Sequence, residues 1–399
     1  MKRPSTDASV HLDAIRGLAA VWVLLGHSRG FFIKSGLTQL VAAQSSAPAQ
    51  SGLPGVPALS VPESIFSLHW QFRPLLLDRA IASRMAVIVF FVLSGYLVGG
   101  SVLRTMRKGV FSWKTYLFQR LTRLWVVLIP ALLIGAAFDF CGLKFLPGAL
   151  NIYHAGPLVA PNIGRDLTLT AFFGNLFFLQ GIVTRFFGTN GPLWSLSFEF
   201  WYYLSFPLLA AVLTGFKSIH YRIAGTLLLL PLMLFCGWKI GIYFLIWLLG
   251  AAIAALPLCL PSAWKKSFTY AAVLLLFFTA FLELRFPIIG FLSDIILGIV
   301  FALFLWTVLH AQDVTVPKLY RVSAQTLSGM SYTLYLAHAP MLIFISALLV
   351  PVWGFWPFSL TSLLKLTLID LTVFAASYLI YYCFERNTPR IRNWLLAQW

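Results

Sequence analysis

The sequence predicts an all-α polytopic membrane protein, a bundle of about ten transmembrane helices, and three observations support that fold class. Only 10% of the 399 residues are charged and 60% are hydrophobic, whereas a soluble domain carries roughly 25% charged residues. The apolar residues fall in runs of about 17–23, the length that crosses a hydrocarbon core. Lys and Arg residues cluster in the connections between these runs, as they do on the cytoplasmic side of membrane proteins.

The apolar runs place ten candidate spans along the chain, with boundaries that are approximate to several residues. If the N-terminus is inside the cell, ten spans leave the cationic clusters, such as 104–123 and 386–392, on the cytoplasmic side. Both termini are then predicted to be cytoplasmic. The predicted spans are 14–33, 82–103, 121–139, 194–216, 223–238, 240–257, 267–284, 289–309, 328–350 and 362–384.

Two longer connections, 34–81 and 140–193, fall on the extracytoplasmic side of this topology. Within the second, 166–182 is apolar but short, with Gly174 and Asn175 in its middle. A span here would place every later cationic cluster outside, so we predict an interfacial or re-entrant helix; an eleventh, broken span is the alternative. The whole chain, 1–399, is predicted to form one transmembrane domain without an appended soluble domain.

The net charge of +17 would suggest a nucleic-acid partner on a soluble protein. Here the cations belong to membrane-flanking clusters and form no separate water-soluble module, so we expect membrane lipid as a partner and no nucleic acid. The four cysteines lie singly, without the spacing of metal ligands. The sequence therefore predicts no metal site.

An ionisable residue inside a membrane span is costly and is held there by a partner or by a function. Arg16 and His27 lie eleven residues apart in the first span, which is three helical turns plus about 20°, so they share one helix face. The helical rise puts His27 about 16 Å deeper than Arg16. Histidine can remove a hydroxyl proton near neutral pH. The alternative is a buried histidine that is satisfied by a neighbouring helix.

Two further segments hold residues suited to a nucleotide ligand. Ser94, Gly95 and Tyr96 belong to a small-residue face of the second span, which permits close helix packing or backbone contact with a ligand. Arg120 and Arg123 are three residues apart at the inner end of the third span, so their guanidinium groups project to the same side and match phosphates. Helix packing and lipid head-group anchoring are the respective alternatives.

Glu199 lies within the fourth span, in the aromatic segment 191–204. An isolated carboxylate in such a place costs about 2.5–3.5 kcal/mol or more, so we expect it to face a polar cavity or to pair with a cation or an imidazole. A carboxylate that orients a histidine would serve the chemistry of His27. Trp194 and Ser197 share this segment and are predicted to contact substrate.

Tyr332, Tyr335 and His338 recur at a spacing of three in the ninth span. This spacing predicts a stripe of two hydroxyl groups and one imidazole on a single helix face. Substrate contact by Tyr332 and His338 is one interpretation. Tyrosines also gather at membrane interfaces, so a structural role is the other.

Taken together and in this order, the five segments resemble the acyltransferase type 3 family of bacterial membrane proteins. Each motif alone is weak, but five in register across nearly the whole chain are specific. The family has a basic residue and a histidine in the first span, an FFxxSGY segment, an RxxR pair, an aromatic segment with serine and glutamate, and a late SYxxYLxH segment. The matching residues are Arg16 and His27; Phe90, Phe91, Ser94, Gly95 and Tyr96; Arg120 and Arg123; Trp194, Ser195, Ser197 and Glu199; and Ser331, Tyr332, Tyr335, Leu336 and His338.

The resemblance implies an O-acyltransferase, usually an acetyltransferase, that modifies hydroxyl groups of cell-envelope or exported glycans at the bacterial cytoplasmic membrane. It implies acetyl-CoA, or another acyl-CoA, as the co-substrate and a glycan or lipid-linked saccharide as the acceptor. His27 would be catalytic with Arg16 as its companion, and Arg120 and Arg123 would lie near the CoA phosphates. A homodimer is left open.

The main alternative is a transporter or flippase for lipid-linked sugars that uses the same buried polar residues as a pathway. Transporter folds are commonly built from internal repeats, and none is apparent in this sequence. A second alternative is a structural or sensory membrane protein with packed, satisfied histidines. It predicts that replacing His27 alters stability more than chemistry.

Overall fold

The computed structural model describes residues 7–33, 77–146, 153, 166–214, 219–255, 264–285, 290–310 and 316–398. These residues form helices and no β-strand, as predicted. The elements are α1 (Asp7–Phe32), α4 (Leu77–Ser94), the π-helix η2 (Gly95–Gly99), α5 (Gly100–Arg107), α6 (Trp113–Phe145), α8 (Leu169–Leu176), the short 3-10 helix η3 (Gly191–Leu193), α9 (Trp194–Thr214), α10 (Ile219–Ala255), α11 (Lys265–Arg285), α12 (Phe291–His310), α13 (Lys318–Trp353), α14 (Leu360–Cys383), the 3-10 helix η5 (Glu385–Asn387) and α15 (Thr388–Ala397).

Nine helices of the described part are long and apolar enough to cross a membrane, and one of them, α10, holds two of the predicted spans. α10 breaks at Gly237, whose φ of 79° lies in the left-handed region that glycine adopts without steric cost. Its first half follows α9 after a short connection, and Gly225 lies against Leu208 of α9. The first half therefore runs antiparallel to α9.

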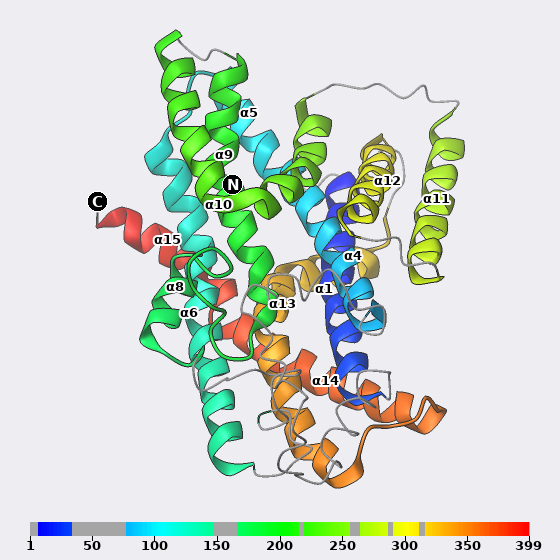
Figure 1. Ribbon diagram of the computed structural model, residues 1–399. Coiled ribbons are helices and arrows are strands. Elements are labelled where there is room, and N and C mark those ends of the chain that lie inside the picture. The colour runs from blue at the N-terminus through cyan, green and yellow to red at the C-terminus, as the bar shows by residue number, and fades with distance from the viewer. Residues whose placement is uncertain are drawn as a thin grey trace, which may run out of the picture.

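The second half of α10 runs in the opposite direction from the first. The Tyr202 hydroxyl donates to the Ile240 carbonyl, and farther along both helices Phe206 packs against Trp247. Contacts that advance together along two helices show that the second half is parallel to α9. The chain therefore changes direction within α10, which Figure 1 also shows. The two halves of α10 correspond to two of the ten predicted spans, and the other eight predicted spans each fall on one of the remaining long helices of the described part.

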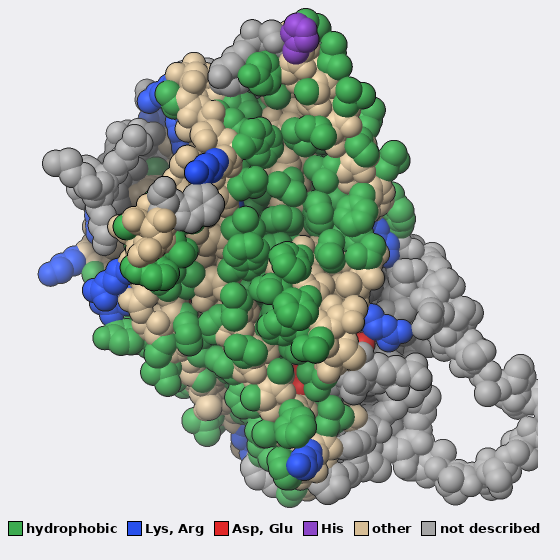
Figure 2. All heavy atoms as spheres, turned by 90° about the vertical axis from the view of Figure 1, so that its left-hand side faces the viewer, with side chains coloured by type: hydrophobic (Ala, Val, Ile, Leu, Met, Phe, Trp, Pro, Cys, Tyr) green, Lys and Arg blue, Asp and Glu red, His purple; other side chains and the backbone are tan. Residues whose placement is uncertain are grey.

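The outer surface of the bundle is apolar over long stretches. Leu227, Leu230 and Leu234 of α10 are 67%, 60% and 82% exposed, and Phe277 of α11 is 70% exposed. Figure 2 shows one such face, where hydrophobic side chains dominate and basic side chains lie mostly near the margins. Soluble monomers rarely expose contiguous apolar patches larger than a few hundred Å², so this surface is suited to lipid.

Several helix ends that carry basic residues lie at one end of the bundle. Figure 1 shows the end of α5 and the starts of α6, α10 and α11 toward its upper end. They adjoin Arg107, Lys114, Arg222 and Lys265.

The apolar segment 166–182 does not cross the bundle as a span. It contains α8, a helix of 8 residues that is about 12 Å long and too short to cross a membrane. Asn175 ends up fully buried, where its amide nitrogen donates to the carbonyls of Ala171 and Arg185, both at 2.8 Å. The structure thus favours the prediction of a non-spanning helix over that of an eleventh span.

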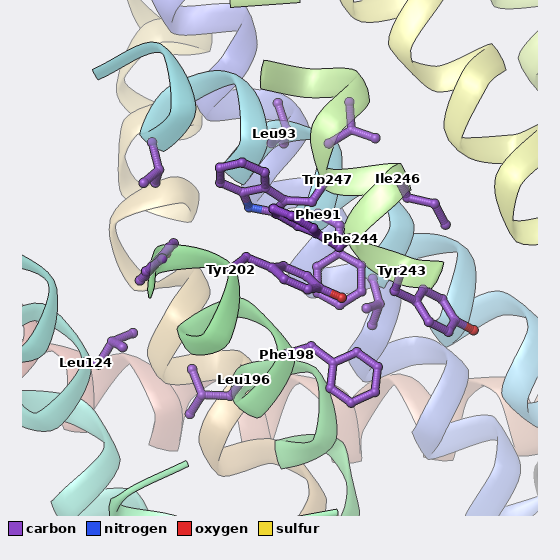
Figure 3. Close-up of a cluster of buried hydrophobic side chains, with 14 of the residues drawn as sticks. Phe91, Leu93, Leu124, Leu196, Phe198, Tyr202, Tyr243, Phe244, Ile246 and Trp247 are labelled. Carbon is purple, nitrogen blue, oxygen red and sulfur yellow. The ribbon is translucent and has the colours of Figure 1, made fainter. Parts of the chain in front are cut away.

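The small-residue face of the second span packs against the second half of α10. A Cβ at Gly95 would collide with the Trp247 carbonyl, and a Cβ at Gly250 would collide with the Val92 carbonyl. The backbones are therefore in direct contact, as small residues permit. Figure 3 shows the aromatic cluster beside this contact, where Phe91, Tyr202 and Trp247 converge from α4, α9 and α10.

A buried ion-pair network joins α4 to α11 and α12. Arg84 donates to Glu283 at 2.5 Å and lies 3.2 Å from Asp294, and these two carboxylates are 3% and 1% exposed. Asp294 also accepts a hydrogen bond from Tyr243 of α10 at 2.5 Å. The network supplies polar contacts between helices that otherwise meet through apolar side chains.

Gly250→Ala tests the close helix contact. The added methyl group would meet the Val92 carbonyl and the Tyr96 amide, so we expect a destabilisation of about 1–3 kcal/mol, as for overpacked cores. The measurement is thermal unfolding of the purified protein in detergent. Gly241→Ala is the matched control, because a Cβ there would meet no atom within 4 Å; equal melting temperatures for the two variants would contradict the contact.

Candidate active site

His27 of α1 and His338 of α13 form a hydrogen-bonded pair in the interior of the bundle. His27 Nδ1 lies 2.9 Å from His338 Nε2, and the two rings are stacked with centroids 5.0 Å apart. α1 and α13 run parallel, since His11 near the start of α1 likewise contacts Tyr320 near the start of α13. The sequence predicted neither this pairing nor the proximity of the two helices.

The hydrogen bonds of this pair fix where the protons lie. His338 Nδ1 is 3.0 Å from the Leu334 carbonyl, which can only accept, so Nδ1 carries the proton and a neutral His338 keeps its lone pair on Nε2. That nitrogen must accept from His27, so His27 Nδ1 carries a proton. A neutral His27 then has its own lone pair on Nε2, the nitrogen that faces away from His338.

The two histidines differ in their access to other molecules. His338 is fully buried, at 0% exposure, so its imidazole does not reach a substrate in this structure. His27 keeps part of its surface accessible although protein surrounds it on most sides. Of the two histidines, only His27 is thus partly exposed.

The segment that precedes α9 is hydrogen-bonded to α13 near His338. Pro340 has no N–H to donate to the Leu336 carbonyl one turn earlier, and the Asn190 amide donates to that carbonyl instead, at 2.8 Å. The Tyr335 hydroxyl donates to the Pro192 carbonyl at 2.9 Å. These bonds hold α13 in place near the histidine pair.

Arg16 is also hydrogen-bonded to α13. Its Nη2 donates to the Ser328 carbonyl at 2.7 Å, and the Ser328 hydroxyl donates to Asp13 at 2.6 Å. Arg16 and His27 thus both face α13, which agrees with the predicted shared face of the first span.

Charged side chains from four elements lie around Arg16. Arg16 interacts electrostatically with Arg123 of α6, with Asp13 one turn earlier on α1, with Glu385 of η5 and with Glu199 of α9. Within the described part of the chain, no ion pair joins any two of these five side chains. The two guanidinium groups therefore have carboxylates around them but no carboxylate in direct contact, so their N–H donors are not taken up by an ion pair.

Glu199 and Glu385 of this cluster each accept hydrogen bonds through only one carboxylate oxygen. Glu199 Oε1 accepts from Ser94 at 2.8 Å and from Tyr203 at 2.5 Å. Glu385 Oε2 accepts from the Thr333 amide at 3.0 Å and from the Thr333 hydroxyl at 2.6 Å. Among the described residues, the second oxygen of each carboxylate has no hydrogen-bond partner.

Arg120 is held differently from Arg123, although both project from the same side of α6. Its guanidinium lies over the rings of Tyr116 and Tyr203, 5.5 and 5.7 Å from their centroids, a cation–π arrangement. Pro207 leaves the Tyr203 carbonyl without its helical donor, and the Tyr116 hydroxyl donates to it at 3.0 Å. The Arg123 side chain, in contrast, is exposed.

Glu199 does not contact His27, which was one of the predicted pairings. His27 is bonded to His338 instead, and Glu199 faces Arg16 through the charged cluster. Among the described residues Glu199 forms no ion pair with a cation either; its hydrogen bonds come from Ser94 and Tyr203. Tyr332 lies near Glu199 as well, with its hydroxyl 3.3 Å from the Leu124 carbonyl.

The remaining predicted site residues have structural contacts. Gly95 is closed off by α10, and Ser94 donates to Glu199 and accepts from Trp247 at 3.1 Å. Ser197 is fully buried, and its hydroxyl donates to the Phe178 carbonyl at 2.7 Å. Trp194 packs against Phe91 and Phe198, and Tyr96 is half-buried.

Sequence reasoning missed three contributors to the charged cluster: Ser328, Thr333 and Glu385. Ser328 and Thr333 bond to partners that are 315 and 52 residues away in the sequence, which spacing within one helix does not indicate. Glu385 follows the last long helix and carries no spacing signal. Among the described residues, no group of three His, Cys, Asp or Glu side chains is placed to hold a metal ion.

The fold and the site define a polytopic helical membrane protein with a histidine pair and a charged cluster in its interior. A family model described as an acyltransferase domain matches residues 10–382. The chain therefore belongs to the acyltransferase type 3 family, and it is a membrane acyltransferase by that membership.

One curated relative supports no more specific statement. An uncharacterized protein of Haemophilus influenzae (strain Rd) is 27% identical over 153 residues, which cover 37% of this chain and 56% of that protein. The chain thus spans just over half the length of the relative that it matches. No solved structure matches the chain.

The proton positions of the histidine pair can be tested without an activity assay. We expect ¹⁵N NMR of histidine-labelled protein near neutral pH to show His27 with a protonated Nδ1 and an unprotonated Nε2, because His338 Nε2 must accept from it. His27→Asn serves to assign the signals. A His27 signal with the proton on Nε2 would contradict the arrangement.

Proposed function

We propose that the protein is an O-acyltransferase that moves an acyl group, most often acetyl, from acyl-CoA to a hydroxyl group of a cell-envelope or exported glycan. The observation that carries the proposal is the hydrogen-bonded chain from Leu334 through His338 to His27, which leaves a lone pair on His27 Nε2. Such a nitrogen can remove a proton from an alcohol or attack a thioester itself.

The charged cluster supports an anionic donor. Acyl-CoA carries its phosphates at one end and its thioester at the far end of a flexible arm, so it needs cations near a surface and a base deeper in the protein. Arg123 is exposed, Arg16 is half-buried, and His27 lies farther along the same face of α1. Guanidinium forks match phosphate oxygens, and Arg120 beside Arg123 adds a third cation.

The transfer balances with these groups alone. The acceptor hydroxyl oxygen attacks the thioester carbonyl carbon while His27 Nε2 takes the hydroxyl proton. The carbon–sulfur bond then breaks, and the CoA thiolate takes that proton from His27. Transfer through an acyl-histidine would use the same lone pair, so both routes depend on the proton position that His338 sets.

The membrane placement follows from the same proposal. Cationic connections at one end of the bundle would face the cytoplasm, where acyl-CoA is made, in a bacterial cytoplasmic membrane with both chain termini inside. The glycan or lipid-linked saccharide acceptor would reach His27 from the opposite side. Tyr332 and Trp194, which are half-buried, are the predicted substrate contacts that remain accessible.

His27→Ala should abolish acyl transfer while leaving the protein folded in the membrane. Loss of a general base costs typically 10²–10⁴-fold in rate, and loss of a nucleophile costs at least as much. The measurement is the ester-bound acetate of envelope and secreted glycans in cells that carry each variant. His220→Ala is the control, because His220 is exposed at the start of α10; full acetylation with His27→Ala would contradict the mechanism.

Arg123→Ala should weaken the binding of acetyl-CoA to the purified protein. Hydrogen bonds to charged groups contribute about 1.5–3 kcal/mol each, so we expect the Kd to rise about tenfold or more, and further with Arg120→Ala. Arg222→Ala, at an exposed site on the same end of the bundle, is the matched control. Equal affinities would assign the two arginines to membrane anchoring, and sugar movement without acyl transfer would favour a transporter.

A further inference from the structure

The last residues before α15 return to the charged cluster. Glu385, in η5, is held to Thr333 in the middle of α13 by two hydrogen bonds, of 3.0 Å from the amide and 2.6 Å from the hydroxyl. Both bonds fall on Oε2, so the orientation of the carboxylate is fixed. Thr333 belongs to α13, the helix that also carries His338 and contacts Arg16.

The fixed carboxylate lies near both arginines without binding either. Glu385 interacts electrostatically with Arg123 and with Arg16, yet no ion pair joins it to them among the described residues. The two hydrogen bonds from Thr333 therefore hold the Glu385 carboxylate in a position where it does not pair with the arginines. An arginine that is near a carboxylate but unpaired keeps its donors available for another anion.

We propose that Glu385 lowers the affinity of the site for its anionic donor and for the free CoA product, and that Thr333 keeps Glu385 from occupying the arginines itself. The inference rests on the proposed function, because it takes the phosphates of acyl-CoA as the anion between Arg16 and Arg123. A fixed negative charge beside a bound phosphate repels it. A donor site that binds too tightly would retain the CoA product and slow each turnover.

Two substitutions separate this electrostatic role from a structural one. Glu385→Gln keeps an oxygen that can accept both hydrogen bonds from Thr333 but removes the charge. Thr333→Val removes the hydroxyl bond and keeps the shape of the side chain; the carboxylate is then held by the amide bond alone and can move more readily toward the arginines. The first variant should bind acetyl-CoA more tightly and the second more weakly, whereas a merely structural contact would weaken binding in both.

The experiment is a titration of the full-length protein in detergent or nanodiscs with acetyl-CoA and, separately, with CoA. We expect the Kd to fall about fivefold to tenfold in Glu385→Gln and to rise about fivefold in Thr333→Val, with both effects shrinking at high salt. In the double variant the effect of Thr333→Val should disappear, because no charge is left to reposition. Thermal unfolding of each variant checks that the fold is intact.

The outcomes distinguish the inference from the proposed function. If the wild-type protein does not bind acetyl-CoA, or Arg123→Ala binds it equally well, the donor site itself is wrong and the inference falls with it. If Arg123→Ala binds weakly but Glu385→Gln binds no more tightly than the wild type, the donor site stands and the inference is overturned. Opposite shifts in the two single variants would establish it.

Discussion

The hydrogen bond between His27 and His338 is the interaction on which the site depends. It joins the first long helix to α13, and with the Leu334 carbonyl it assigns one proton to each Nδ1 and leaves the His27 Nε2 lone pair available. Second partners of this kind fix the tautomer and the orientation of functional imidazoles in many sites. Here the partner is another histidine, wholly buried, rather than a carboxylate. Such a pair can fix a tautomer without placing a charged partner among apolar helices.

Two charged side chains near the histidine pair are held by α13. The Ser328 carbonyl holds Arg16 and Thr333 holds Glu385, while the prolines Pro207 and Pro340 free backbone carbonyls that Tyr116 and Asn190 then occupy. Each of these contacts satisfies a polar group that would otherwise be costly in the bundle. Polar contacts of α13 therefore extend from the charged cluster to the histidine pair, in the interior of a bundle whose outer surface is apolar.

Sequence reasoning predicted the features that depend on local pattern. The number and order of the spans were predicted from apolar runs and cationic clusters. Two of the predicted spans meet near Gly237, where α10 is broken. The shared face of Arg16 and His27 followed from helical spacing. The partners of Glu199 and His338 did not, because spacing within one helix says nothing about which helix lies opposite. Tyr332, Tyr335 and His338 were expected to form a stripe, but successive steps of three drift by about 60° each, and they bond to α6, to the segment before α9 and to α1.

We propose that His27 Nε2 is the reacting nitrogen of an acyl-CoA site that begins at Arg123. The decisive measurement is a structure of the complex with a non-hydrolysable acetyl-CoA analogue. We expect phosphates beside Arg123 and Arg16, and the acyl carbonyl carbon near His27 Nε2 at a separation approaching about 3–3.5 Å, with His338 still bonded to Nδ1. An analogue bound away from this cluster, or a His27 ring turned toward lipid, would contradict it.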